Sequence, residues 1–116
     1  MKGKTTPTYL VRGCYTSEAI AAMVRKPEDR SVAVRGLVES LGGKMEGFWL
    51  ASGEHDFVGI VQFPDLQTAA AFAMAASAGG AVHHFKTVPL LTWAEGISAF
   101  KKAAGLNYRP PTKPAN

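Results

Sequence analysis

Residues 43–64, GKMEGFWLASGEHDFVGIVQFP, decide the fold of this chain. Two runs of bulky, β-favouring residues flank a short polar turn at residues 52–56. The pattern predicts a β-hairpin in which Gly53 supplies a backbone conformation that other residues avoid and Asp56 closes the turn. The hairpin gives two neighbouring strands from which the rest of a sheet can be placed.

The second strand of this hairpin is apolar on both faces. Side chains alternate between the two faces of a sheet, so Phe57, Val61 and Phe63 share one face. Val58 and Ile60 share the other. Both faces need a cover, and a chain of 116 residues can cover only one with its own helices. The sequence therefore predicts that the second face meets another chain.

The order of the remaining elements predicts an α+β, ferredoxin-like fold. They are a strand at 8–15, a short helix at 18–25 after Thr16 or Ser17, a helix that begins at Pro27 and ends at Gly42, a helix at 66–78 capped by Asp65, a strand at 81–93 with Pro89 at a sheet edge, and a helix at 94–104. With right-handed crossovers, this βαββαβ order gives an antiparallel sheet with an extra C-terminal helix. Two such sheets packed face to face give a dimeric α/β barrel.

The composition predicts one domain, residues 7–104, between an N-terminal tail at 1–6 and a proline-rich C-terminal tail at 105–116. The single cysteine, Cys14, cannot form an internal disulfide, which is typical of a reducing compartment. The first residues are polar, and no apolar stretch approaches the length of a membrane span. We therefore expect a cytoplasmic protein without a membrane partner.

The net charge of +4 at pH 7 comes from the two tails. Four of the 13 basic residues lie there, namely Lys2, Lys4, Arg109 and Lys113. The nine that remain match the nine acidic residues, which all lie between Glu18 and Glu95. The body of the domain is formally neutral and lacks the excess of basic residues that binding to phosphate backbones needs, so we expect no nucleic-acid partner.

Three short motifs resemble the GYD-domain family over roughly residues 7–93. They are Leu41-Gly42-Gly43, the aromatic pair Phe48-Trp49, and Gly53-Glu54-His55-Asp56 before an apolar strand. The family is named for a Gly-Tyr-Asp signature near the hairpin turn, and this chain carries His55 where the family usually has tyrosine. The resemblance implies a ferredoxin-like fold similar to dimeric α/β barrels, and it implies no particular activity.

The predicted topology gathers titratable side chains at one end of the sheet. Strands one and two run the same way and strands three and four return, so one end collects Cys14, Tyr15, Glu54, His55, Asp56, His83 and His84. Alternation along a strand places His83 and His84 on opposite faces, so that only one of them joins a given pocket. We expect a ligand pocket to open at this end, with His55 affecting ligand binding more than stability.

Each candidate residue also has a structural interpretation. Asp56 is a catalytic candidate or a turn residue, and His55 is a catalytic candidate or a solvated loop residue. Arg12 anchors an anion inside the barrel or forms an interface ion pair, and Trp49 lines the barrel or seals the dimer. Cys14 is a small core residue or a nucleophile. The other ligand-binding candidates are Tyr15, Glu54, His83 and His84.

Three functions are compatible with these residues. The first is a homo-oligomer that binds a small apolar molecule, either as a binding protein or as a cofactor-independent enzyme. The second is a purely structural assembly module without a ligand. The third is a metal- or haem-using enzyme acting through His55, His83 or His84, although the histidine spacing matches no metal motif. The sequence names no cofactor, and a roomy pocket favours the first function whereas a solid barrel favours the second.

Overall fold

The computed structural model describes residues 6–112 of the chain. Their elements are, in order, β1 (Thr8–Tyr15), α1 (Ser17–Arg25), α2 (Arg30–Ser40), β2 (Lys44–Leu50), β3 (Phe57–Gln62), α3 (Leu66–Ala78), β4 (Val82–Leu90) and α4 (Trp93–Ala104). The four strands form one antiparallel sheet in the order β2-β3-β1-β4. The α+β, ferredoxin-like fold predicted from the sequence is confirmed, and β4, which contains Pro89, is an edge strand.

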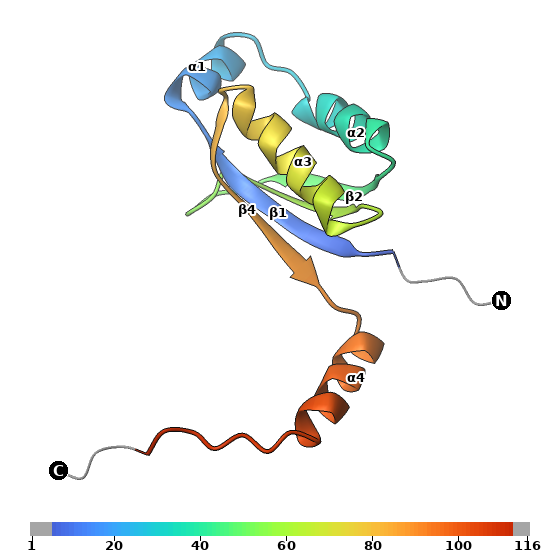
Figure 1. Ribbon diagram of the computed structural model, residues 1–116. Coiled ribbons are helices and arrows are strands. Elements are labelled where there is room, and N and C mark those ends of the chain that lie inside the picture. Colours follow the sequence, from blue (N-terminus) through green and yellow to red (C-terminus); the bar gives the residue numbers. More distant parts are fainter. Residues whose placement is uncertain (1–5, 113–116) are drawn as a thin grey trace.

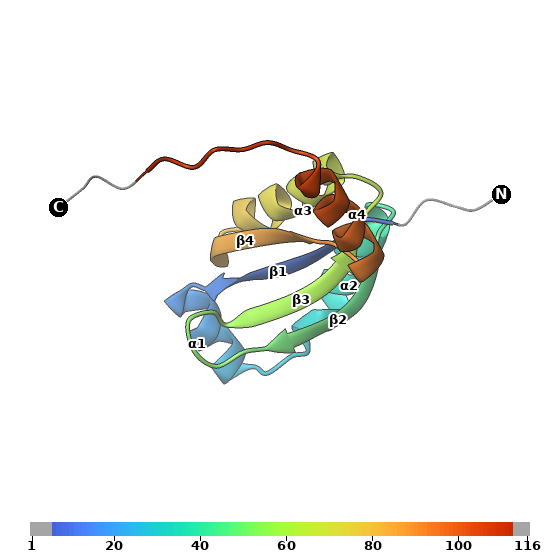
Figure 2. The ribbon, with the colours of Figure 1, turned by 90° about the horizontal axis from the view of Figure 1, so that it is seen from below.

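Helices cover only one face of this sheet. Figure 1 shows α1, α2 and α3 on the same side, where α1 packs on β1, α2 on β2 and α3 on β4. Figure 2 looks onto the opposite face, where the four strands lie side by side with none of these three helices in front of them. We call this second face the open face. The helix-covered face and the open face therefore have to be considered separately as sites of function.

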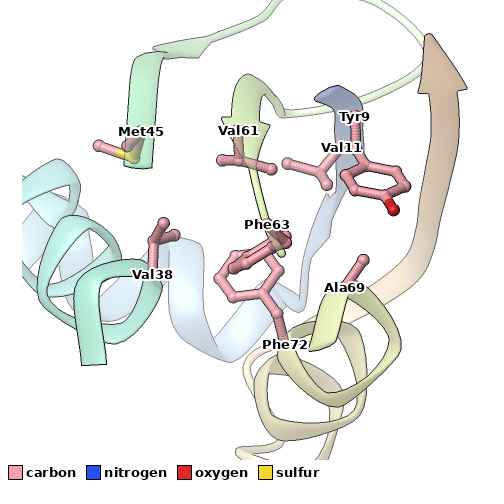
Figure 3. Close-up of a cluster of buried hydrophobic side chains, with 8 residues drawn as sticks. All are labelled: Tyr9, Val11, Val38, Met45, Val61, Phe63, Ala69 and Phe72. Atoms are coloured by element: carbon pink, nitrogen blue, oxygen red, sulfur yellow. The ribbon is translucent and has the colours of Figure 1, made fainter. Parts of the chain in front are cut away.

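The hydrophobic core lies between the sheet and the three helices. Phe57, Val61 and Phe63 share one face, as the alternation of β3 predicts, and the structure shows that this is the buried helix side. The ring of Phe63 packs against that of Phe72 from α3, with centroids 5.4 Å apart. Figure 3 shows these two rings at the centre of the cluster, with Val38 of α2 beside them. The core thus ties two helices to the central strands.

The two element boundaries that differ most from those predicted are the start of the second helix and the end of the last strand. The second helix begins at Arg30 rather than Pro27, because Asp29 is its N-cap and accepts a hydrogen bond from the Ser31 amide at 2.9 Å. The last strand ends at Leu90, and Thr92 then starts α4 with a capping box that includes Glu95. In both places a side chain that satisfies free helix amides sets the boundary.

Helix α4 extends away from the rest of the domain. It lies beyond the end of β4, on the side of the sheet opposite α1–α3 (Figure 1). Trp93, Ile97 and Phe100 follow the i, i+4, i+7 spacing of one helix face. They are exposed by 80%, 48% and 63% of their surface. This apolar helix face has no cover within residues 6–112.

Candidate functional site

The hairpin turn is bonded to the end of β1. The Asp56 amide donates to the Gly13 carbonyl at 2.8 Å, and the Asp56 carboxylate accepts from the Tyr15 amide at 2.9 Å. The Cys14 thiol donates to the Glu54 carbonyl at 3.5 Å. These contacts bring the turn residues, Cys14 and Tyr15 together at one end of the sheet. Because both hydrogen bonds of Asp56 join it to the backbone of β1, they favour its interpretation as a structural turn residue.

His55 does not lie on a solvated loop tip. Its side chain is only 10% exposed, whereas the neighbouring Glu54 side chain is 86% exposed. The His55 Nδ1 lies 3.9 Å from Glu54 Oε1. The interpretation of His55 as a solvated residue is wrong, because the hydrogen bonds of Asp56 draw the turn onto the end of β1.

His83 and His84 lie side by side rather than on opposite faces. Between the pairs Arg12–Lys86 and Cys14–His83, β4 contains one more residue than β1, which forms a β-bulge. His84 has a φ of +53° there. The two imidazole rings face each other through their Nδ1 atoms, with centroids 4.5 Å apart. The prediction from strict alternation is wrong because the bulge interrupts it.

Arg12 and Trp49 both lie on the open face. Arg12 stands opposite Val58 on one side and Lys86 on the other. Its buried Nε has no hydrogen-bond partner within residues 6–112. Trp49 also stands opposite Val58 and is half exposed. These two candidates are therefore separated by the sheet from anything bound on the helix side.

A cavity of about 430 Å³ lies on the helix side of the sheet, between the strands and α1, α2 and α3. Aromatic residues of the strands and of α3 line it, namely Tyr15, Phe48, Phe57, Phe72 and Phe85. The helices contribute small side chains, which include Ala19, Ala22, Ala33, Ala75 and Ala76. Charged side chains enter only from the segment between α1 and α2 and from the start of α2, as Glu28 and Arg30.

Tyr15 is the residue that joins the hairpin end to this cavity. Its ring packs on Phe57 with centroids 5.1 Å apart, and burial raises the pKa of its phenol above the usual 10.0. The Arg30 cation opposes that rise, and the Asp56 carboxylate adds to it. Arg30 in turn pairs with Glu28 at 3.0 Å. The phenol is thus a neutral hydrogen-bond donor at neutral pH, and Arg30 lines the same cavity.

We expect the stability of the domain to fall above pH 10 partly through Tyr15. A raised folded-state pKa means that the unfolded chain loses this proton first. The contribution of Tyr15 to the free energy of unfolding is fully present below its unfolded-state pKa of about 10, and it is lost as the pH rises through its folded-state pKa. Denaturant unfolding measured at a series of pH values above about 10 checks this expectation. The free energy of unfolding should fall less steeply with pH in Tyr15→Phe than in the wild type. Equal profiles for the two proteins would contradict the assignment.

Sequence reasoning identified only Tyr15 among the residues that line the cavity. The other candidates, Arg12, Trp49, Glu54, His55, Asp56, His83 and His84, do not line it. Glu28 and Arg30 also line the cavity, but the sequence gives no functional signal for them, because Pro27-Glu28 is a pattern typical of a helix start. No group of three or more His, Cys, Asp and Glu side chains is placed to hold a metal ion anywhere in residues 6–112.

Comparison with known proteins identifies a family and a fold. Residues 9–100 match the sequence profile of the GYD domain. Among solved structures, the crystal structure of MtbAldR is similar with a TM-score of 0.52 and 12% sequence identity. The match covers 79% of this chain and 59% of that chain, so it supports the fold alone. No curated protein matches the sequence. None of the helices in residues 6–112 has the length and apolar character needed to cross a membrane.

Proposed function

The chain belongs to the GYD domain family, and on that premise we propose that it is a homo-oligomeric protein that binds a small molecule in the cavity between its helices and its sheet. The cavity itself is the observation that carries the proposal. Its volume of about 430 Å³ lies within the range of roughly 300–1,000 Å³ that is usual for ligand pockets. Its apolar lining with a few polar groups is also usual for such pockets.

The cavity favours ligand binding over the alternative functions. A purely structural module predicts solid packing between the sheet and its helices, whereas a space of about 430 Å³ lies between them here. Catalysis by His55 or Asp56 needs these groups to reach the ligand, and neither lines the cavity. The proposed role is therefore binding. The unpaired Cys14 supports the cytoplasm as the proposed location.

The open face supports the homo-oligomer. Leu10 stands between Ile60 on β3 and Val88 on β4, which makes an apolar centre on the face that α1, α2 and α3 leave uncovered (Figure 1). A second copy that packs its own open face here would complete the α/β barrel. It would also offer an acceptor to the unpartnered Nε of Arg12. The uncovered apolar face of α4 lies on the same side of the sheet and is available to the same partner.

Filling the cavity tests the proposal. Ala22→Phe places a ring at an exposed position of α1 that lines the cavity, whereas Ala21→Phe places the same ring at an exposed position of α1 that does not line it. Native mass spectrometry of freshly purified protein reports oligomer mass and any retained small molecule together. We expect a retained ligand with wild type and Ala21→Phe, and its loss with Ala22→Phe. Equal retention by all three proteins would overturn the cavity as the site.

A further inference from the structure

The cavity has an aromatic side. Phe57 lies at the centre of a continuous group of rings, with centroid distances of 5.1 Å to Tyr15, 5.6 Å to Phe48 and 6.0 Å to Phe85. Phe85 continues the group to Phe72 at 5.8 Å. Rings at such distances pack with tilted faces and edges, and an added ring can extend the same arrangement. A flat aromatic molecule should bind here with a more favourable free energy than a flexible chain of equal size, because a flexible chain loses more conformational freedom on binding.

The helix side of the cavity is built differently. Half of the residues that line it from α1, α2 and α3 are alanines, whose methyl groups project little into the space, and Met23, Val34 and Leu37 are larger apolar side chains on the same side. Methyl groups on one side and rings on the other leave room for a rigid ligand of modest thickness. Larger side chains at the same alanine positions would fill that room.

The polar groups of the cavity are mainly hydrogen-bond donors. Tyr15 presents a neutral phenol, and its hydroxyl makes no hydrogen bond to the protein within residues 6–112. Arg30 carries five N–H donors, and the structure shows one hydrogen bond from it, from the NH1 atom to Glu28. The Arg30 side chain is 43% exposed and that of Glu28 is 60% exposed, so Arg30 is the more enclosed partner. Exposed pairs of this kind are weak, and a ligand oxygen can compete with Glu28.

Building on the proposed function, we infer that the cavity binds a flat aromatic compound that carries a carboxylate, with the rings among the phenylalanines and the carboxylate between the Tyr15 hydroxyl and the Arg30 guanidinium. Arginine matches the two oxygens of a carboxylate with two parallel N–H donors. The phenol adds a third donor from the β1 side. Glu28 then stays at the cavity mouth and disfavours a second acidic group on the ligand.

Three probes separate the parts of this inference, and isothermal titration calorimetry measures their affinities. Naphthoate has the rings and the carboxylate, naphthylmethylamine has the rings with the opposite charge, and decanoate has the carboxylate without rings. We expect naphthoate to bind most tightly. Arg30→Gln should weaken naphthoate binding about tenfold or more, which is the usual effect of losing a hydrogen bond to a charged group. Tyr15→Phe should weaken it less.

Arg25→Gln is the matched control, because Arg25 ends α1 and does not line the cavity. It should bind naphthoate as wild type does, and thermal unfolding should show that all three variants are folded. If naphthylmethylamine binds more tightly than naphthoate, the polar end of the ligand contacts Glu28, and the inference that the ligand carries a carboxylate is wrong. If decanoate binds more tightly than naphthoate, the inference that the ligand is aromatic is wrong. If Ala22→Phe leaves the binding of every probe unchanged, the cavity is not the site and the proposed function itself fails.

Discussion

Replacing Ile60 by lysine is expected to split the proposed homo-oligomer into folded monomers, whereas the same change at the neighbouring Val61 is expected to unfold the chain. Ile60 points to the open face, where its strand neighbour is Leu10. Val61 points to the helix side and has no exposed surface. A lysine at position 60 can keep its charge in water once the subunits separate. A lysine at position 61 brings an unpaired charge into the core, which costs several kcal/mol.

Sedimentation and circular dichroism at micromolar concentration distinguish these outcomes. Wild type should sediment as a dimer or a larger oligomer of the 12.3 kDa chain. Ile60→Lys should sediment as a monomer with an unchanged far-ultraviolet spectrum, and Val61→Lys should lose that spectrum. An interface on the open face should bury on the order of 1,600 Å². A wild-type protein that sediments only at 12.3 kDa would contradict the proposed assembly.

The strands were predictable because their pattern is local. Alternation in residues 57–63 placed Phe57, Val61 and Phe63 on one face, without showing which face the helices cover, and β1 lies at Thr8–Tyr15 as its run of apolar residues indicates. Pro89 indicated the edge strand, because proline removes a donor from the ladder. These features follow from single residues or short periods. Predicting them does not require knowledge of what packs against the strand.

The cavity and the bulge were not predictable for the opposite reason. Ala75 and Ala76 have the same sequence signal whether a helix packs closely on a sheet or leaves space above it. The extra residue at His84 depends on how β4 pairs with β1, which no pattern within β4 encodes. Arg30 and Tyr15 line the same cavity although they lie on α2 and β1. Such features depend on the tertiary arrangement of elements that are far apart in sequence.

Asp56→Ala is expected to reduce the free energy of unfolding by an amount near the lower end of the about 1–3 kcal/mol that an unsatisfied buried donor costs, because the donor here is partly buried. The lost acceptor is the carboxylate that the Tyr15 amide now contacts at 2.9 Å. That cost is a large part of the roughly 5–15 kcal/mol that stabilises a domain. Asp56→Asn keeps an acceptor oxygen and should cost less. Denaturant unfolding measures both values.

Glu54→Ala is the matched control in the same turn, because that side chain is 86% exposed and Cys14 contacts only its backbone carbonyl. It should change stability by less than about 0.5 kcal/mol. Equal effects of Glu54→Ala and Asp56→Ala would show that the carboxylate contact contributes nothing. Because the same contact fixes the backbone of Tyr15, Asp56→Ala should also weaken naphthoate binding, even though Asp56 does not line the cavity. The turn would then act on the ligand through the position of Tyr15, which is a role that His55→Ala, measured in parallel, should not reproduce.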